Sequence, residues 1–154
     1  MKNKWVIFDL DGTLANIENR LEKSTINGKL NYGKLHESSL IALDEPMTEV
    51  IDFLKSFKRF GCKIMILSAR FESTIKVTKE WFDKYNIPYD ILKLKSMNET
   101  YMHSAKWKSK YLMELLTEIS SPENVILAVD DFEPNQKMFE SHGIHCLNPN
   151  IITN

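Results

Sequence analysis

Two pairs of aspartates stand directly after short apolar runs that lie far apart in the chain. Asp9 and Asp11 follow the run WVIF, and Asp130 and Asp131 follow VILAV. Carboxylates gathered around one point repel each other, and the cost grows when water is partly excluded. A divalent cation removes that repulsion and can also neutralise a phosphate. Because hard oxygen ligands suit Mg²⁺, the two pairs predict a magnesium site.

An alternation of predicted strands and helices must position these aspartates. Strands are predicted at 5–10, 62–67, 89–94, 125–129 and 144–147, and helices at 46–60, 73–85, 104–119 and 134–142. This order predicts an α/β fold, a Rossmann-like three-layer sandwich with a central parallel sheet. Ligands of such sheets bind beyond the carboxyl ends of the strands, so Asp9, Ser68 and Asp130 should meet at one rim.

Residues 14–45 interrupt the alternation, and we call them the inserted segment. Asn27-Gly28 is a hairpin signal within it, and Asp44 or Glu45 is placed to cap the helix that opens at Pro46. We expect residues 1–154 to form a single domain, in which the inserted segment is a small cap after the first strand. A mobile loop without a role is the alternative.

Composition excludes several classes of protein. The formal net charge is −1, so no global field attracts nucleic acid or an anionic membrane. No stretch approaches the roughly 20 apolar residues that cross a bilayer, and Asp9 breaks the only N-terminal apolar run that could begin a secretion signal. Cys62 and Cys146 lie in apolar runs, which predicts buried, reduced thiols in a cytoplasmic protein. No obligate protein partner is indicated.

The chain resembles the haloacid dehalogenase (HAD) superfamily of phosphohydrolases over nearly its whole length. Four elements appear in the superfamily's order: DLDGT from Asp9, LSAR ending at Arg70, a lysine near Trp107, and VDD ending at Asp131. The resemblance implies a HAD-like fold and a phosphatase that passes through an aspartyl-phosphate. Asp9 would attack phosphorus, and Asp11 would protonate the leaving oxygen and then deprotonate the attacking water.

The resemblance also implies the other members of the site. The residues implied for phosphate or substrate binding are Thr13, Ser68, Ala69 and Arg70. The residues implied for Mg²⁺ are Asp9, Asp11, Asp130 and Asp131. Arg70 could instead pair with a carboxylate of the rim. Asn135 resembles a position that supports the acidic loop, although it could equally be a residue at a helix start.

A lysine would stabilise charge on the phosphoryl group and on the nucleophile. Lys106, Lys108 and Lys110 compete for this role. The superfamily pattern places apolar residues one position before the lysine and three and four positions after it. Trp107 and Tyr111-Leu112 meet this pattern around Lys108, which we therefore favour over Lys106.

A narrower resemblance is to the phosphatase half of phage polynucleotide kinases and their small phage-encoded relatives. It rests on residues 9–21, on Ser68-Ala69-Arg70 and on the TKEWF run from Thr78. Ala69 stands where that group has glycine, and Lys93-Leu94-Lys95 where it tends to carry methionine and arginine. The resemblance implies a polynucleotide 3′-phosphate or a nucleotide as substrate. No glycine-rich kinase loop is present, so we expect no kinase half.

Other hypotheses stay open from the sequence. Five residues could form a basic approach for a polynucleotide, or could be ordinary solvated side chains: Lys93, Lys95, His103, Lys106 and Lys110. A (deoxy)nucleotidase or small-metabolite phosphatase is an alternative, with specificity set by the inserted segment. A non-enzymatic phospho-acceptor like a response-regulator receiver is a third hypothesis. Asp11, two positions after the expected nucleophile, favours turnover over a receiver.

Overall fold

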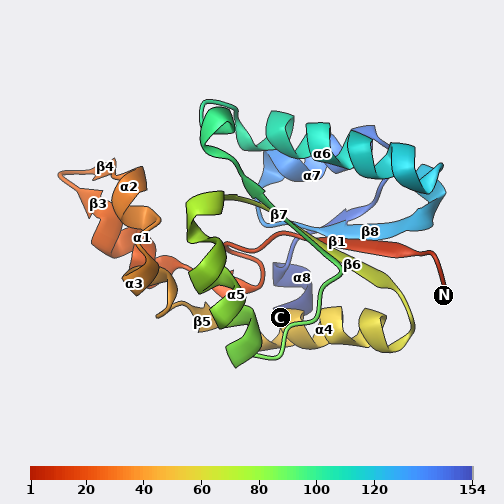
Figure 1. Cartoon of the computed structure of the whole chain (residues 1–154), viewed down its shortest axis with the longest axis horizontal. Coiled ribbons are helices and arrows are strands. Elements are labelled where there is room, and N and C mark those ends of the chain that lie inside the picture. The colour runs from red at the N-terminus through yellow and green to blue at the C-terminus, as the bar shows by residue number, and fades with distance from the viewer. Residues whose placement is uncertain (154) are drawn as a thin grey trace.

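Five parallel strands form the central sheet of the computed structural model, which describes residues 1–153 (Figure 1). Their order across the sheet is β7 (Ile91–Lys95), β6 (Lys63–Phe71), β1 (Trp5–Phe8), β8 (Val125–Val129) and β9 (Cys146–Leu147). Every neighbouring pair of strands runs parallel. The predicted α/β fold with a central parallel sheet is therefore confirmed.

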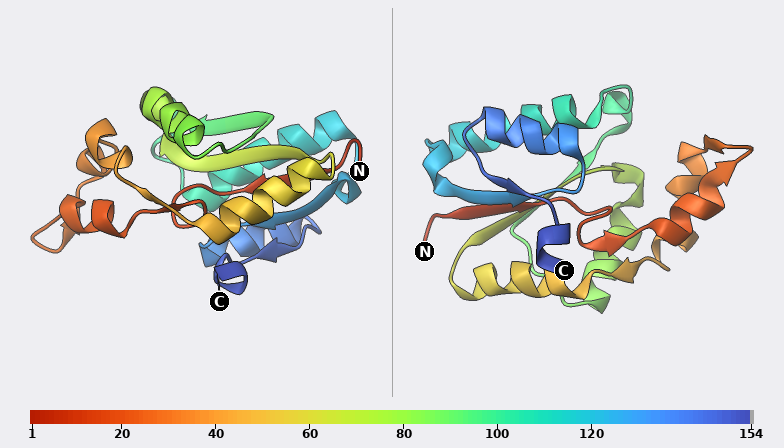
Figure 2. Two further views of the ribbon diagram at one scale, coloured as in Figure 1. Left: turned by 90° about the horizontal axis from the view of Figure 1, so that it is seen from below. Right: turned by 180° about the vertical axis from the view of Figure 1, so that it is seen from behind.

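Helices cover both faces of the sheet. Helices α6 (Ser104–Ile119) and α7 (Glu133–Ser141) lie on one face, and α4 (Thr48–Arg59) and α5 (Ile75–Lys84) lie on the other (Figures 1 and 2). Successive strand residues point to opposite faces. Ile7 accordingly packs in the hydrophobic cluster that includes residues of α6, and Phe8 packs in the cluster that includes residues of α4. Because both faces of the sheet are buried, the sequences of the strands are continuous apolar runs.

The chain reverses its direction across the sheet at β1. From β1 it passes to β6 and β7 on one side, and it returns to β8 on the other side of β1. The carboxyl ends of β1 and β8 therefore flank the crevice where ligands bind in open α/β sheets. Asp9 leaves β1 there with its N–H donating to Val129 O at 2.9 Å, and Asp130 directly follows β8.

Strand β6 extends four residues beyond the end predicted at residue 67. Its pairing with β7 is irregular between Ser68 and Phe71, and Phe71 still pairs with Lys95. Ser68, Ala69 and Arg70 therefore lie inside the strand, where the sequence placed Ser68 at its end. The irregular pairing is what brings these residues to the rim without ending the strand.

The inserted segment contains seven short elements, and it projects beyond the carboxyl ends of the sheet (Figure 2). They are β2 (Ala15–Asn16), α1 (Glu18–Ser24), β3 (Thr25–Ile26), β4 (Lys29–Leu30), α2 (Tyr32–Leu35), α3 (Ser38–Ile41) and β5 (Glu45–Pro46). The hairpin signal is confirmed: Asn27 and Gly28, both at positive φ, join β3 to β4. Antiparallel pairing of β2 with β5 closes the base of the segment.

The expected cap of α4 is absent. The helix begins at Thr48, and its N-cap residue, Met47, accepts no side-chain hydrogen bond. The prediction that Asp44 or Glu45 caps this helix is wrong, because β5 holds residues 45–46 and the Asp44 carboxylate binds Arg20 instead.

The remaining elements are short. They are α8 (Asn150–Thr153) and the 3₁₀ turns η1 (Glu72–Thr74), η2 (Met97–Glu99) and η3 (Pro122–Asn124). Cys62 is buried and Cys146 half-buried, and neither forms a disulfide. Within residues 1–153, every helix is too short or too polar to cross a membrane.

Candidate active site

Three carboxylates meet at the crevice between β1 and β8. Asp9, Asp130 and Asp131 each place an oxygen within 4.8 Å of the others. The ammonium group of Lys108, from α6, lies 2.8 Å from Asp9 Oδ1 and 2.6 Å from Asp130 Oδ2. Lys108 is buried, whereas Lys106 on the same helix is exposed. The structure therefore places Lys108, and not Lys106, against the expected nucleophile.

The charges of this cluster are unbalanced. Burial raises the pKa of Asp9, and Asp130 and Asp131 raise it further, against the opposing effect of Lys108. Burial alone would lower the pKa of Lys108, but the two carboxylates beside it outweigh burial and raise that pKa. One cation thus faces three carboxylates, which is an arrangement that a further cation would stabilise.

Asp130 is held by the start of helix α7. Asn135 Nδ2 lies 3.1 Å from each Asp130 carboxylate oxygen, and Phe132 N–H donates to Oδ1 at 3.0 Å. The Gln136 amide donates to the Asp130 carbonyl at 2.8 Å. Asn135 therefore supports the acidic loop, which was one of its two sequence interpretations. These contacts fix the carboxylate in the orientation that faces Lys108.

Asp131 lies against the turn that carries Gly12. Gly12 has a φ of +81°, and a Cβ built on it would lie 2.2 Å from Asp131 Oδ2. Both the left-handed backbone and the close approach therefore require glycine.

We expect Gly12→Ala to displace Asp131 from the cluster. Activity should fall about 10–100-fold, the usual effect of disturbing groups around a metal site. Gly28→Ala is the matched control, because Gly28 has a φ of +73° with nothing within 4 Å of its Cβ position. Both variants carry the backbone strain, but only Gly12→Ala should lose phosphatase activity. Equal activity in the two variants would show that the position of Asp131 is unimportant.

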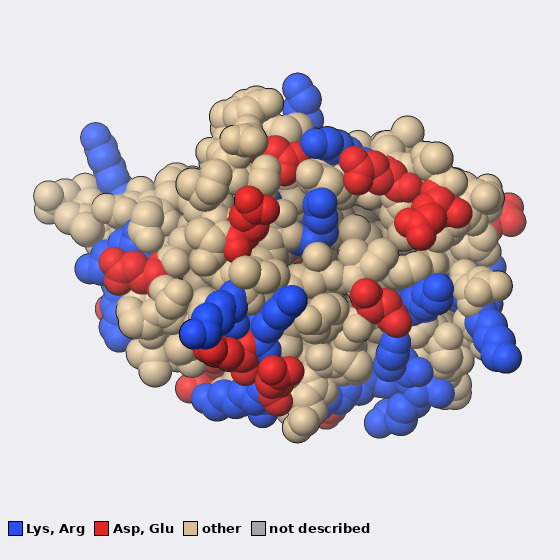
Figure 3. Space-filling model, in the orientation of Figure 1, with Lys and Arg blue, Asp and Glu red and all other residues tan. Residues whose placement is uncertain are grey.

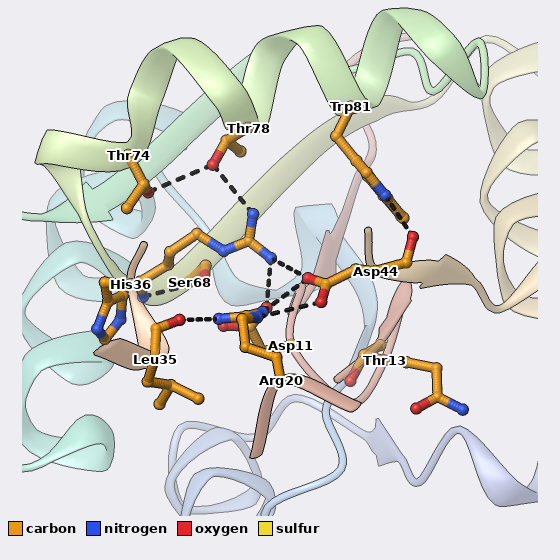
Figure 4. Close-up of polar contacts among 12 residues, drawn as sticks. Asp11, Thr13, Arg20, Leu35, His36, Asp44, Ser68, Thr74, Thr78 and Trp81 are labelled. Carbon is orange, nitrogen blue, oxygen red and sulfur yellow. Dashed lines mark hydrogen bonds and ion pairs between the residues drawn. The ribbon is translucent and has the colours of Figure 1, made fainter. Parts of the chain in front are cut away.

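Asp11 pairs with two arginines, Arg20 and Arg70, and is not a member of the three-carboxylate cluster. Figure 4 shows Asp11 beside Arg20 and Asp44. Its Oδ1 accepts from Arg20 Nη2 at 2.6 Å and from Arg70 Nη2. Burial would raise the pKa of Asp11, but Arg70 and Arg20 outweigh it and hold the pKa well below its usual range. The two guanidinium groups thus favour the ionised form of Asp11, and its side chain contacts them while the three-carboxylate cluster consists of Asp9, Asp130 and Asp131.

Arg20 and Asp44 complete this second cluster. The Arg20 guanidinium binds both oxygens of Asp44, at 3.1 and 2.8 Å, and donates to Leu35 O at 3.0 Å. The sequence did not single out Arg20 as a site residue, and it assigned Asp44 to a helix cap. The only signal was a basic and an acidic residue inside the inserted segment, a pattern typical of solvated surfaces.

Helix α5 anchors the cluster from the other side (Figure 4). Thr78 Oγ1 lies 3.0 Å from Arg70 Nη1, and Trp81 Nε1 donates to Asp44 O at 2.9 Å. Arg70 also approaches Asp44 Oδ2 at 3.4 Å. Of the two interpretations of Arg70, pairing with a carboxylate of the rim is the one seen. Thr78 of the TKEWF run contacts Arg70, and Trp81 of the same run contacts Asp44.

The remaining predicted residues lie around Asp9. The Thr13 hydroxyl donates to Asp9 Oδ2 at 3.3 Å. An open pocket of about 340 Å³ is lined by Asp9, Ser68, Ala69 and Arg70, although Asp9, Ser68 and Arg70 are largely buried. Its other wall comes from the inserted segment, including Tyr32 and His36. A phosphate ester in this pocket would therefore lie between the expected nucleophile and the inserted segment.

Solved structures with the same fold include putative phosphatases, a haloacid dehalogenase-like hydrolase and a putative β-phosphoglucomutase. A putative phosphatase from Clostridium difficile is 15% identical over 96% of this chain and 85% of its own, with a TM-score of 0.73. The haloacid dehalogenase-like protein SP0104 from Streptococcus pneumoniae is 14% identical over 94% and 83% of the two chains, with a TM-score of 0.67. A comparison with curated proteins finds no match.

Fold and site together define a phosphatase of the haloacid dehalogenase type. Residues 3–150 match the family described as the polynucleotide kinase PNKP phosphatase domain, and the chain belongs to that family. A chain in the structure of a Pnkp1/Rnl/Hen1 complex is 28% identical, with a TM-score of 0.72. The match covers 96% of the present chain but only 46% of that one, so the present chain spans less than half of that relative.

Proposed function

We propose that the protein removes the 3′-phosphate from a polynucleotide, with Mg²⁺ as cofactor and Asp9 as nucleophile. The observation that carries this proposal is the contact of buried Lys108 with Asp9 and Asp130 beneath an open pocket. Membership of the PNKP phosphatase family supports a polynucleotide end as the substrate. A second structure of the 28% identical relative is described as an RNA repair complex. The two free cysteines support a reducing compartment such as the cytoplasm.

The residues present fit Mg²⁺. Asp9, Asp130 and Asp131 offer hard oxygen ligands within reach of one ion, and Lys108 alone does not balance their charge. When bound, Mg²⁺ would neutralise charge on the phosphoryl oxygens. The Asp11 side chain, which the sequence included among the metal ligands, contacts Arg20 and Arg70 here. The proposal therefore assigns the side-chain ligands to the other three aspartates.

The reaction has two half-reactions. An Asp9 carboxylate oxygen forms a bond to phosphorus as the bond between phosphorus and the ester oxygen breaks. The ester oxygen takes a proton and leaves as the free hydroxyl, and an aspartyl-phosphate remains. Water then attacks that phosphorus, the Asp9 oxygen leaves, and inorganic phosphate is released. Lys108 is placed to stabilise Asp9 in both steps, and the Ser68 hydroxyl lies in the pocket to donate to a phosphoryl oxygen.

Asp11 suits the two half-reactions unequally. Its ionised form can accept a proton from the attacking water, but the two guanidinium groups that lower its pKa also weaken it as a base. Protonation of the leaving oxygen requires Asp11 to carry a proton, which the two guanidinium groups oppose. Both roles therefore require Arg20 or Arg70 to loosen its contact with Asp11 when substrate binds, and leaving-group dependence in Asp11→Asn tests the acid role in the first step.

Magnesium should stabilise the folded protein as well as support turnover. Ligand that binds only the folded state raises stability by about 2.7 kcal/mol at one hundred times its Kd. We expect Mg²⁺ to raise the melting temperature of the wild type, and EDTA to reverse the rise and abolish phosphatase activity. Asp131→Asn keeps the shape of the side chain and should lose most of the melting shift. An unchanged wild-type melting temperature at saturating Mg²⁺ would contradict the site.

A panel of phosphate esters tests the substrate. With Mg²⁺, phosphate release should be faster from a 3′-phosphorylated oligonucleotide than from a 5′-phosphorylated one or from sugar phosphates. Preference for a sugar phosphate or a free nucleotide would instead favour a small-metabolite phosphatase or nucleotidase. We further propose that the inserted segment acts as a cap, because Tyr32, Leu35 and His36 form one wall of the pocket.

A further inference from the structure

A groove continues from the active-site pocket along the rim. It has a volume of about 470 Å³ and shares Tyr32, His36, Ala69 and Ser104 with the pocket. It runs on between helix α2 of the inserted segment and the loop of residues 100–104 that leads into α6. Because the groove opens directly from the pocket that Asp9 lines, it offers room for the leaving group of a phosphate ester held at Asp9.

Two aromatic rings in the groove are left open to solvent. Tyr101 is 81% exposed and Tyr32 is 62% exposed, although both line the groove. They come from different elements, the loop before α6 and helix α2. Beneath them His36 stacks on Phe71, with ring centroids 3.9 Å apart and planes 11° apart. The groove thus also contains a stacked aromatic pair, whereas none of the ring pairs found within residues 1–153 includes Tyr32 or Tyr101.

Few positively charged side chains near the groove are free to bind a phosphate backbone. Of the five residues considered for a basic approach, Lys95 is buried with its Nζ 2.6 Å from Met102 O, and Lys110 pairs with Glu99 at 2.8 Å. Lys93 lies over the ring of Tyr111. The face seen in Figure 3 mixes positive and negative side chains over most of its area, and its group of positive side chains lies at the lower right, over the C-terminal end of α4. His103, which lines the groove, and Lys106 are exposed, so two of the five residues remain open to a backbone phosphate. The attraction of phosphates is limited to these two, and the aromatic rings are the stronger feature.

Resting on the proposed function, we propose that this groove binds the 3′-terminal nucleoside of a single-stranded polynucleotide, with its base stacked on the exposed rings of Tyr32 and Tyr101. Aromatic rings stack on any base, and each stacked base contributes about 1–3 kcal/mol. Only an unpaired end has a base free to leave its neighbours and stack on protein. Pocket and groove together provide separate places for the phosphate and for the nucleoside that carries it.

The test compares two 3′-phosphorylated oligonucleotides that differ only in whether the last nucleotide carries a base or is abasic. In the wild type, the base should lower KM about tenfold, within the range that stacking gives. Tyr32→Ala/Tyr101→Ala should reduce that difference to about twofold or less, whereas Tyr32→Phe/Tyr101→Phe should retain it, because phenylalanine keeps the ring. Blunt duplex ends should be poorer substrates than single strands.

The matched control is Phe60→Ala, which removes an equally exposed ring (67%) at the end of α4, outside the groove. It should keep the wild-type preference for a base. Equal KM values for the two oligonucleotides in the wild type, with normal turnover of both, would contradict base stacking in the groove. The proposed phosphatase activity would be unaffected by that result. If a 3′-mononucleotide bound as tightly as the oligonucleotide, the proposal that the ligand of the groove is a polynucleotide would be wrong. Absence of magnesium-dependent turnover on every substrate, including glycerol 2-phosphate, would instead contradict the proposed function.

Discussion

Asp9→Asn should lower turnover by roughly 10⁴–10⁶-fold, as loss of a catalytic nucleophile does in other enzymes that form covalent intermediates. The amide keeps the size of the side chain but cannot form the aspartyl-phosphate. The loss should appear in kcat for every substrate, because the same atom attacks phosphorus whatever the leaving group. Steady-state phosphate release with Mg²⁺ measures it.

The same variant should keep its stability without metal. Burial and two neighbouring carboxylates disfavour the ionised form of Asp9, so a neutral amide relieves repulsion in the cluster. Lys108 still has Asp130, 2.6 Å away, as its partner. We expect a melting temperature in EDTA at or above that of the wild type. An Asp9→Asn protein that is folded and retains most of its activity would exclude Asp9 as nucleophile.

Arg20→Met should be the most destabilising of the proposed substitutions. The Arg20 side chain is fully buried and binds Asp44 and Asp11, so its removal leaves two carboxylates short of a partner. Breaking a buried ion pair from one side costs about 3–5 kcal/mol, a large part of the 5–15 kcal/mol that stabilises most domains. Urea unfolding should show a lower midpoint at an unchanged slope. Activity should fall as well, because Asp11 loses one of its two guanidinium contacts.

Arg59→Met provides the matched control, since Arg59 is exposed in the last turn of α4. Arg59→Met should change the free energy of unfolding by no more than about 0.5 kcal/mol. The loss of stability in Arg20→Lys should lie between those of Arg59→Met and Arg20→Met. Lysine keeps the positive charge but lacks the guanidinium group that binds both Asp44 oxygens. A change below about 1 kcal/mol in Arg20→Met would mean that the cluster contributes little to folding.

Much of the fold could be predicted because periodicity and chain breaks mark the larger elements. Helix α6 and strand β8 have the predicted bounds, 104–119 and 125–129, since Ser121-Pro122 separates them. The end of β6 could not be predicted in the same way. It is set by pairing of Phe71 with Lys95 on a neighbouring strand, and local sequence carries no record of that pairing.

The acidic residues of the site could be identified from the sequence because two pairs of aspartates directly after buried strands are unusual for purely structural reasons. Their convergence follows from the rule that parallel strands present their carboxyl ends to one rim. The arginine cluster follows from no such rule. Arg20 meets Asp44, 24 positions later, only because β2 and β5 close the inserted segment and return the chain to the rim. That cluster also decides the ionised state of Asp11, which the spacing of the DLDGT motif left open.

The central claim is that phosphate passes through a covalent bond to Asp9. Rapid acid quenching during hydrolysis of a saturating 3′-phosphorylated oligonucleotide, followed by peptide mass spectrometry, tests it most directly. The account predicts a phosphoryl group on Asp9 that forms within the first turnover and requires Mg²⁺. A phosphoryl group on any other side chain, or none on Asp9 while turnover proceeds at its maximal rate, would contradict it.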